Sequence, residues 1–280
     1  MVNSHGRFVW YELMTTDMEA AKAFYASVVG WSARDAAMPG VAYSVFTAGD
    51  APVAGLLKLP DQARKMGVAP HWIGYVGVGD VDAAATRAGQ LGGAVHIPPA
   101  DVPNISRFSV IADPQKAVLA LIKELKPRQE QPFGPRTLGH VGWHELLAAD
   151  WEKAFAFYAE LFGWQKAESH VGAMGRYQQF SAGGEPIGGM FTKPPELPFP
   201  FWLYYFNVSS IEAVAQRAQA GGGQIVYGPA EVPGGSWIVH CTDPQGAIFG
   251  LLDRRMRKAV GYFLRDALPE PAVTRAASRS

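Results

Sequence analysis

Two glutamates, Glu12 and Glu145, are the side chains in this sequence best suited to chemistry. Each follows a tryptophan by two residues, Trp10 or Trp143, within a segment rich in aromatic and branched residues. Such a segment favours a β-strand, on which alternate side chains share a face. A carboxylate desolvated beside an indole has a raised pKa, and it can bind a ligand or remove a proton from one. We therefore take Glu12 and Glu145 as candidate catalytic residues.

An internal repeat relates the two glutamates. Residues 8–31 return at 141–164 with an offset of 133, and the copies match at 12 of 24 positions. In the first copy Asp17 suits a helix N-cap, and Gly30 suits the end of a helix. Between them, apolar residues follow the i, i+3, i+4, i+7 spacing of one buried helix face: Ala21, Phe24, Tyr25 and Val28. Each copy is predicted to be a strand, which carries the glutamate, followed by a helix.

The same pattern starts again at residues 71 and 201, now at an offset of 130. The chain therefore contains four strand–helix–strand–strand–strand units, two per domain. We predict domains at residues 7–126 and 139–256, a proline-rich linker at 127–138 and a tail at 257–280. The segment after the second helix of each domain, residues 98–103 and 228–233, is interpreted as a loop because of its prolines.

Composition limits the classes of partner. The 280 residues carry 25 Lys and Arg against 25 Asp and Glu, so no net charge favours nucleic acid or an anionic membrane. The sequence lacks the long apolar run that a membrane span or a signal peptide needs. One cysteine, Cys241, excludes an internal disulfide framework and a thiolate metal cluster. We expect a cytoplasmic protein that binds a small organic molecule.

The Asp-capped helix with Phe-Tyr and a terminal Gly-Trp, together with the Asp-Pro-Gln turns at Asp113 and Asp243, resembles the vicinal oxygen chelate superfamily. This superfamily includes glyoxalase I, bleomycin-resistance proteins and extradiol dioxygenases. The resemblance covers about residues 7–256. It implies an α+β fold of four βαβββ units that form two cup-shaped mixed-sheet domains, with the ligand on the concave face and the helices on the convex face.

Enzymes of that superfamily usually hold a divalent metal with His or Glu side chains on the concave strands. By this resemblance, the ligand positions fall at Trp10, Ile73 and Ala120 in the first domain and at Trp143, Leu203 and Gly250 in the second. None of these side chains coordinates a metal. We therefore expect no metal at the usual site and no cofactor, with a divalent metal as the alternative.

Strand alternation then places further groups in the implied cups. In the first domain the inward set is Phe8, Trp10, Glu12, His71, Ile73 and Tyr75. Glu12 and Tyr75 form a carboxylate–phenol pair, and Glu145 and Tyr205 repeat it in the second domain. The candidate ligand-binding residues are Trp10, His71, Tyr75, Trp143 and Tyr205. A structural alternative stays open, in which each pair is a hydrogen bond that ties two half-domains together.

Histidines add little to these candidates. Of the seven, only His71 is clearly predicted to point toward a cup, and its counterpart in the second domain is Phe201. A lone histidine of this kind is more often a hydrogen-bonded structural group than a ligand. His240 is also interpreted as structural, because the equivalent residue Val110 is apolar.

Two classes of function compete. The first is metal-independent binding of a small, partly apolar molecule, as the bleomycin-resistance branch implies. The second is a glyoxalase-like lyase or isomerase in which Glu12 or Glu145 transfers protons. An extradiol-type dioxygenase is a weaker third, because the sequence lacks an iron triad. Four units within one chain make a monomer sufficient, although the sequence is also compatible with a homodimer.

Overall fold

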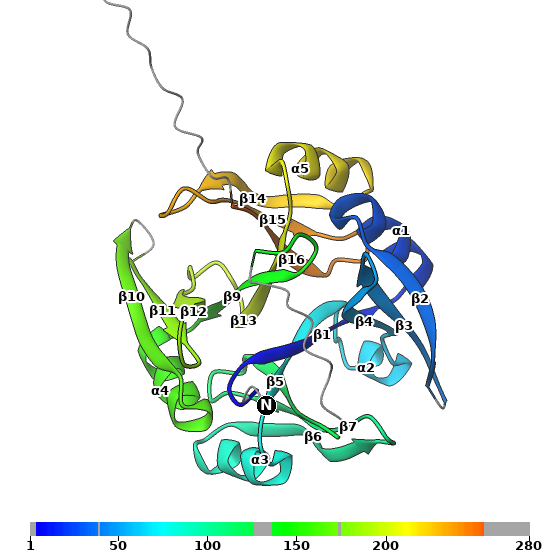
Figure 1. Ribbon diagram of the computed structural model, residues 1–280. Coiled ribbons are helices and arrows are strands. Elements are labelled where there is room, and N and C mark those ends of the chain that lie inside the picture. The colour runs from blue at the N-terminus through cyan, green and yellow to red at the C-terminus, as the bar shows by residue number, and fades with distance from the viewer. Residues whose placement is uncertain (1–3, 39, 126–135, 173–174, 255–280) are drawn as a thin grey trace, which may run out of the picture.

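A computed structural model describes residues 4–38, 40–125, 136–172 and 175–254. Within these residues the strands form two eight-stranded mixed sheets, each curled into a half-barrel, with helices at the periphery (Figure 1). The α+β fold of two cup-shaped sheets is therefore confirmed. The predicted tail at 257–280 and most of the predicted linker lie outside the described residues. The domain boundaries themselves stay predictions.

The first sheet is built from the N-terminal half of the chain. Its strands are β1 (Phe8–Thr15), β2 (Ser32–Met38), β3 (Val41–Ala48), β4 (Ala51–Lys58), β5 (His71–Gly77), β6 (Ala94–Val102), β7 (Ser106–Ala112) and β8 (Val118–Glu124). They lie in the order β2-β3-β4-β1-β5-β8-β7-β6. Strand β1 is parallel to β4 and antiparallel to β5, which places Glu12 between Gly55 and Ile73 at the junction of two units.

The second sheet repeats this arrangement. Its strands are β9 (Val141–Ala148), β10 (Gln165–Gly172), β11 (Gly175–Ser181), β12 (Pro186–Thr192), β13 (Phe201–Asn207), β14 (Gln224–Glu231), β15 (Trp237–Thr242) and β16 (Ile248–Asp253). The order β10-β11-β12-β9-β13-β16-β15-β14 matches that of the first sheet strand for strand. Glu145 accordingly lies between Gly189 and Leu203, in the middle of its sheet.

The helices are α1 (Met18–Val29), α2 (Asp61–Lys65), α3 (Val81–Gln90), α4 (Trp151–Phe162) and α5 (Ile211–Ala220). The predicted caps are confirmed for α1: the Asp17 carboxylate accepts from the Ala20 N–H at 3.0 Å, and Gly30 ends the helix at φ 84°. A residue with a side chain is strained at that φ, which explains the glycine. Asp150 and Gly163 repeat both caps in α4.

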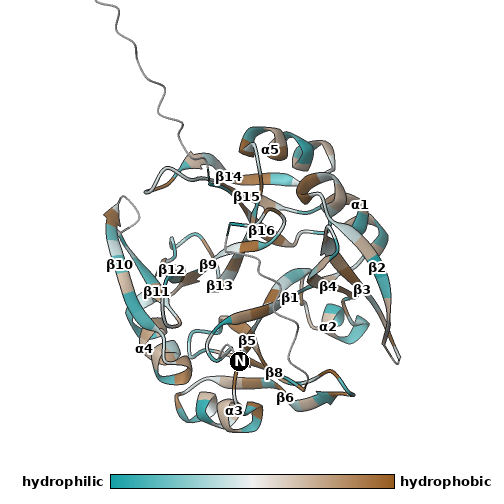
Figure 2. Ribbon diagram, in the orientation of Figure 1, coloured by the Kyte–Doolittle hydropathy of each residue, from teal (hydrophilic) through white to brown (hydrophobic). Residues whose placement is uncertain are grey.

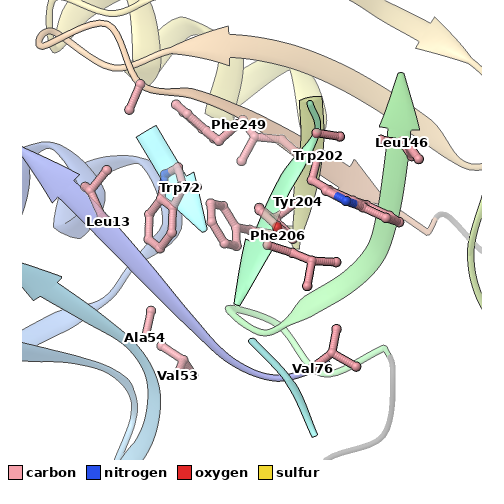
Figure 3. Packing of buried hydrophobic residues seen from close by; sticks show 14 of the residues in the cluster. Leu13, Val53, Ala54, Trp72, Val76, Leu146, Trp202, Tyr204, Phe206 and Phe249 are labelled. Carbon is pink, nitrogen blue, oxygen red and sulfur yellow. The ribbon is translucent and has the colours of Figure 1, made fainter. Parts of the chain in front are cut away.

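The two half-barrels share one hydrophobic core (Figure 3). Side chains from β1 and β5 of the first sheet meet side chains from β9, β13 and β16 of the second, and helix α1 packs against α5 as α3 packs against α4. Trp72 and Phe206 lie with ring centroids 5.0 Å apart across this contact. Two smaller clusters line the inner faces of the separate half-barrels. The convex faces therefore bury each other, and the two smaller clusters lie on the concave faces.

Hydrogen bonds cross the same contact in symmetric pairs. The Trp31 indole donates to the carbonyl of Gly139 at 2.7 Å, and the Trp164 indole donates to the carbonyl of Gly6 at 2.7 Å. Each tryptophan is the one that follows a helix-ending glycine in its repeat. Since buried polar groups are costly unless they are paired, these bonds fix how the halves sit against each other.

Edge strands carry the polar surface of both sheets. Strand β10 is mainly hydrophilic and β2 is mixed, whereas β5 and β13 are hydrophobic (Figure 2). At the opposite edges the structure corrects the sequence prediction: residues 98–102 and 228–231 belong to strands β6 and β14, not to loops. Within the described residues these strands are at the sheet edges, and their pairing with β7 and β15 has register shifts. A sheet edge tolerates proline because no further strand needs its missing N–H.

The prediction that Phe8 faces the concave side of the sheet is wrong. Phe8 packs in the shared core. The pairing of β1 with β5 shifts register between Phe8 and Trp10, so the alternation of side chains fails there. The Phe8 ring stacks on the His144 ring, with the ring centroids 4.1 Å apart, and Val9 packs against the inner cluster instead.

No helix among the described residues is long and apolar enough to cross a membrane.

Candidate functional site

Glu145 is the polar centre of the second half-barrel. Its side chain, on β9, is only 7% exposed. The hydroxyl of Tyr205 on β13 donates to Glu145 Oε1 at 2.8 Å, and the hydroxyl of Tyr177 on β11 donates to Oε2 at 3.0 Å. The predicted pair of Glu145 and Tyr205 is therefore formed, and a second phenol completes it.

Glu12 has the same surroundings in the first half-barrel. The hydroxyl of Tyr75 on β5 donates to Glu12 Oε2 at 2.5 Å, and the hydroxyl of Tyr43 on β3 donates to Oε1 at 2.8 Å. Glu12 itself is half-buried, as is Tyr43. This carboxylate is enclosed by protein on most sides, yet it keeps contact with solvent.

The two tryptophans extend each cluster by one hydrogen bond. The Trp10 indole donates to the Tyr43 hydroxyl at 3.2 Å, and the Trp143 indole donates to the Tyr177 hydroxyl at 2.7 Å. Each half-barrel thus contains an indole–phenol–carboxylate chain. The polar end of each indole is thereby satisfied within the protein, and both rings pack in the inner apolar clusters.

Tyr43 and Tyr177 are site residues that the sequence prediction missed. Both stand two residues after the start of β3 or β11, at an offset of 134. The glycines opposite them make their placement possible, since a Cβ at Gly55 would overlap Tyr43 and a Cβ at Gly189 would overlap Tyr177. A tyrosine and a facing glycine in both repeats were the signal available in the sequence.

Burial sets the electrostatics of the two carboxylates. Desolvation raises the pKa of Glu145 to about 6, although the bonds from Tyr205 and Tyr177 oppose the shift. Desolvation also raises the pKa of Glu12, against the bonds from Tyr75, Tyr43 and Trp10. A carboxyl group with a pKa close to neutrality can accept a proton from a ligand and return it.

His240 enters the second cluster, which the sequence prediction did not anticipate. Its Nε2 atom lies 2.7 Å from the Tyr205 hydroxyl, which also donates to Glu145. Burial lowers the pKa of His240 to about 4, so the ring is neutral. The corresponding strand β7 carries Val110, which belongs to the apolar inner cluster of the first half-barrel.

His71, the histidine that the sequence favoured, contacts the segment just before its own strand. It begins β5 at a half-buried position, and its Nδ1 lies 2.8 Å from the carbonyl oxygen of Ala69. This is the arrangement of a ring held by its own strand end. A role for His71 in binding stays a prediction.

The donor set does not fit the metal that the resemblance implies. At the six expected positions Trp10 and Trp143 donate indole hydrogen bonds, and Ile73, Leu203, Ala120 and Gly250 offer only apolar atoms or none. Among the residues that the structure describes, no group of three or more His, Cys, Asp or Glu side chains is placed to hold a metal ion. Phenol and carboxylate groups form the polar cluster in both half-barrels.

Known proteins share this architecture. Residues 7–121 and 137–251 both match the family described as Glyoxalase/Bleomycin resistance protein/Dioxygenase superfamily. CFP32 of Mycobacterium bovis is 34% identical over 249 residues, which cover 87% of this chain and 93% of that protein. The anthracycline biosynthesis protein DnrV of Streptomyces peucetius is 28% identical over 266 residues, covering 89% of this chain and 94% of DnrV.

Solved structures agree on the fold. The Mn(II)-bound glyoxalase of Novosphingobium aromaticivorans is 14% identical, with a TM-score of 0.62 over 89% of this chain and 82% of that one. The 2,3-dioxygenase LapB of Pseudomonas sp. KL28 is 13% identical, with a TM-score of 0.59 over 88% of this chain and 91% of that one. With both repeats matched and the strand order duplicated, the chain belongs to the glyoxalase/bleomycin resistance protein/dioxygenase superfamily.

Proposed function

We propose that this protein binds a small, partly apolar molecule on the concave faces of its half-barrels, without a metal. The observation that carries this proposal is the repeated cluster in which a carboxylate accepts from two phenols and an indole backs one phenol. The cluster supplies a charged or acidic centre with hydroxyl groups around it.

The remaining lining indicates the class of ligand. Apolar and aromatic side chains surround each cluster, among them Ile73 and Phe108 in the first half and Leu203 and Phe201 in the second. Such a surface suits a flat ring system that carries a carbonyl or hydroxyl group, with the polar group at the carboxylate. The relative DnrV is named for anthracycline biosynthesis, which makes a fused aromatic polyketide our first candidate ligand.

The raised pKa of Glu145 favours a second candidate function, a lyase or isomerase of the glyoxalase type. A carboxylate with a pKa of about 6 is suited to remove a proton next to a carbonyl group and to return it elsewhere. In this version of the proposal Glu145 or Glu12 performs the transfer that a metal-bound group would otherwise assist. The binding proposal and this one share the same residues and differ in turnover.

Titration with two probes separates these candidates. The metal content of the protein is first determined by elemental analysis. An anthracycline, or the hemithioacetal of methylglyoxal with glutathione, is then added to the protein. Calorimetry measures the binding of each probe, and absorbance measures its consumption. We expect anthracycline binding that weakens at least about tenfold in Glu12→Gln, because the amide keeps the shape but removes the charge. Consumption of the hemithioacetal by chelator-treated protein would favour the isomerase.

Two results would count against the proposal. If Glu12→Gln and Glu145→Gln lose thermal stability but keep the parent affinity, the glutamates are structural. If elemental analysis finds one Zn, Ni, Mn or Fe per half-barrel, binding is not metal-independent.

We further propose that a monomer in the cytoplasm is the working form, because the two repeats already pair within one chain and the single Cys241 is a buried thiol.

A further inference from the structure

The two half-barrels differ along the route from the carboxylate to the protein surface. In the second half this route contains His240 on β15 and Tyr227 on β14. At an offset of 130, the equivalent residues in the first half are Val110 and Ile97. Two neighbouring positions are therefore polar in one half and aliphatic in the other, although the carboxylate cluster is the same in both.

The polar residues form a continuous series that becomes more exposed toward the surface. Glu145 is buried, His240 is half-buried, and Tyr227 is 48% exposed. The Tyr205 hydroxyl lies 2.8 Å from Glu145 and 2.7 Å from His240 Nε2. The ring centroids of His240 and Tyr227 are 5.1 Å apart. Glu145 is thus linked to the rim of the half-barrel through Tyr205 and His240.

A hydroxyl group carries one proton, which restricts these hydrogen bonds to two arrangements. When Glu145 is ionised, Tyr205 donates to it and accepts from a protonated Nε2 of His240. When Glu145 is protonated on Oε1, the oxygen that faces Tyr205, it donates to Tyr205, which then donates to an unprotonated Nε2. In this arrangement the tautomer of His240 follows the protonation state of Glu145.

We propose that Tyr205 and His240 form a proton path between Glu145 and solvent, so that the second half-barrel performs acid–base chemistry on a ligand while the first only binds. This deepens the proposed function and rests on it. The suitable ligand class is a carbonyl compound with an acidic C–H next to the carbonyl group. His240 acts through Tyr205 and is a positioning residue in this scheme, whereas Glu145 is the catalytic residue.

The proton balance of the step is simple. Glu145 takes the proton from the ligand carbon, and the electron pair of the broken C–H bond becomes the C=C bond of an enolate. Once Glu145 is protonated, His240 loses its Nε2 proton to solvent and takes a proton from solvent on Nδ1. Protonated Glu145 then passes its proton to Tyr205 as Tyr205 passes its own to Nε2 of His240. His240 releases a proton from Nδ1 to solvent, which restores the carboxylate. Because burial lowers the pKa of His240 to about 4, the ring releases this proton instead of keeping it.

The first half-barrel lacks such a path. Glu12 is half-buried, so part of its surface meets solvent directly. A bound ligand covers that opening, and neither Val110 nor Ile97 carries a proton. The same covering leaves Glu145 connected, since its path runs through the protein. The titratable groups that face this path are Glu145 on β9, Tyr177 on β11, Tyr205 on β13 and Tyr227 on β14.

Nuclear magnetic resonance of the full chain with ¹⁵N-labelled histidine tests the path without any ligand. The His240 signals, assigned by their absence in His240→Gln, should change tautomer with a midpoint near 6, where burial places the pKa of Glu145. This change of tautomer should be absent in Glu145→Gln and in Tyr205→Phe. Tyr205→Phe provides the test if Glu145→Gln does not fold. Signals of His240 that stay constant between pH 4.5 and 8, or that titrate identically in both variants, would overturn the proposal.

A reciprocal exchange tests the chemistry. The hemithioacetal of methylglyoxal with glutathione is incubated in D₂O, and deuterium entering its C–H position is measured with binding in parallel. We expect His240→Val to bind the probe as the parent does and to lose about a hundredfold in exchange rate, while Val110→His gains exchange. An unchanged rate in His240→Val refutes the path. No binding by the parent refutes the proposed function for this probe, and the tautomer titration then decides the path alone.

Discussion

Tyr11 and His144 occupy the same position in the two repeats, and their side chains meet where the half-barrels pack together. The Tyr11 hydroxyl lies 2.6 Å from His144 Nε2, and His144 Nδ1 lies 2.6 Å from the carbonyl oxygen of Ile187. A carbonyl only accepts, so Nδ1 carries the proton and Tyr11 donates to Nε2. The approximate two-fold symmetry of the chain thus brings equivalent residues into contact and gives them opposite roles.

We predict that His144 makes the protein sensitive to acid. Burial lowers its pKa from 6.5 to about 4, so the unfolded chain binds this proton more readily than the folded one. The contribution of His144 to stability is complete above pH 6.5 and is lost as the pH falls through about 4, up to roughly 3 kcal/mol. The free energy of unfolding, measured with urea, should therefore fall less between pH 7 and 4.5 in His144→Phe than in the parent.

The control for this prediction removes both partners. His144→Phe alone leaves the Tyr11 hydroxyl without its acceptor and should cost about 1–3 kcal/mol at pH 7. Tyr11→Phe combined with His144→Phe removes the stranded hydroxyl and should recover part of that loss. Equal acid sensitivity of the parent and His144→Phe would show that other groups govern the transition.

A second prediction concerns Gly74 and Tyr204, which are also equivalent positions in contact. The Gly74 N–H donates to the Tyr204 hydroxyl at 2.7 Å, and a Cβ at residue 74 would lie 2.6 Å from the Tyr204 ring. Gly74→Ala should therefore cost about 1–3 kcal/mol in the free energy of unfolding. Gly79→Ala is the matched control, because a Cβ there meets nothing within 4 Å. Similar unfolding midpoints for the two variants would contradict close packing at this contact.

Local patterns explain which parts of this structure the sequence could predict. The helices and central strands follow from caps and periodicity, as Asp17 and Gly30 illustrate, and the duplication carried those predictions to the second half. The shared core could not be predicted, because the contact between Tyr11 and His144 depends on how the halves pack and no local pattern records that. Phe8 was misplaced for a related reason: a register shift ended the alternation on which the prediction relied.

The candidate site was predictable to a similar extent. Glu145 and Tyr205 lie on adjacent strands of repeated units, so alternation alone brings them together. Tyr177 comes from a strand two places away in the sheet, and only the sheet order reveals that it reaches the same carboxylate. His240 was judged by its apolar counterpart Val110, an argument that assumes the two halves do the same work. Comparison of repeats predicts what they share and misses what separates them.

Glu145 provides a third prediction, opposite in sign to that for His144. Its pKa in the folded protein is about 6, above the ordinary 4.5. Its contribution to stability is therefore complete below pH 4.5 and is lost as the pH rises through about 6, by roughly 2 kcal/mol. Urea unfolding at fixed ionic strength measures the free energy of unfolding of Glu145→Gln and of the parent. The value for Glu145→Gln should rise relative to that of the parent as the pH rises from 4.5 to 7. A difference between the two proteins that does not change with pH would refute the raised pKa.

The last prediction tests whether the phenols hold the carboxylates in their charged form. The hydroxyl of Tyr177 donates to Glu145 Oε2 at 3.0 Å, and a hydrogen bond to the charged form lowers the pKa of an acid. Tyr177→Phe should therefore raise the pKa of Glu145 further above 6, by about one unit, as followed by the ¹³C signal of its carboxyl carbon. Tyr227→Phe is the control, since the Tyr227 ring contacts His240 and not the carboxylate. If the pKa of Glu145 is the same in Tyr177→Phe as in Tyr227→Phe, the Tyr177 phenol does not stabilise the carboxylate. The acid–base role of the cluster would then rest on Tyr205 alone.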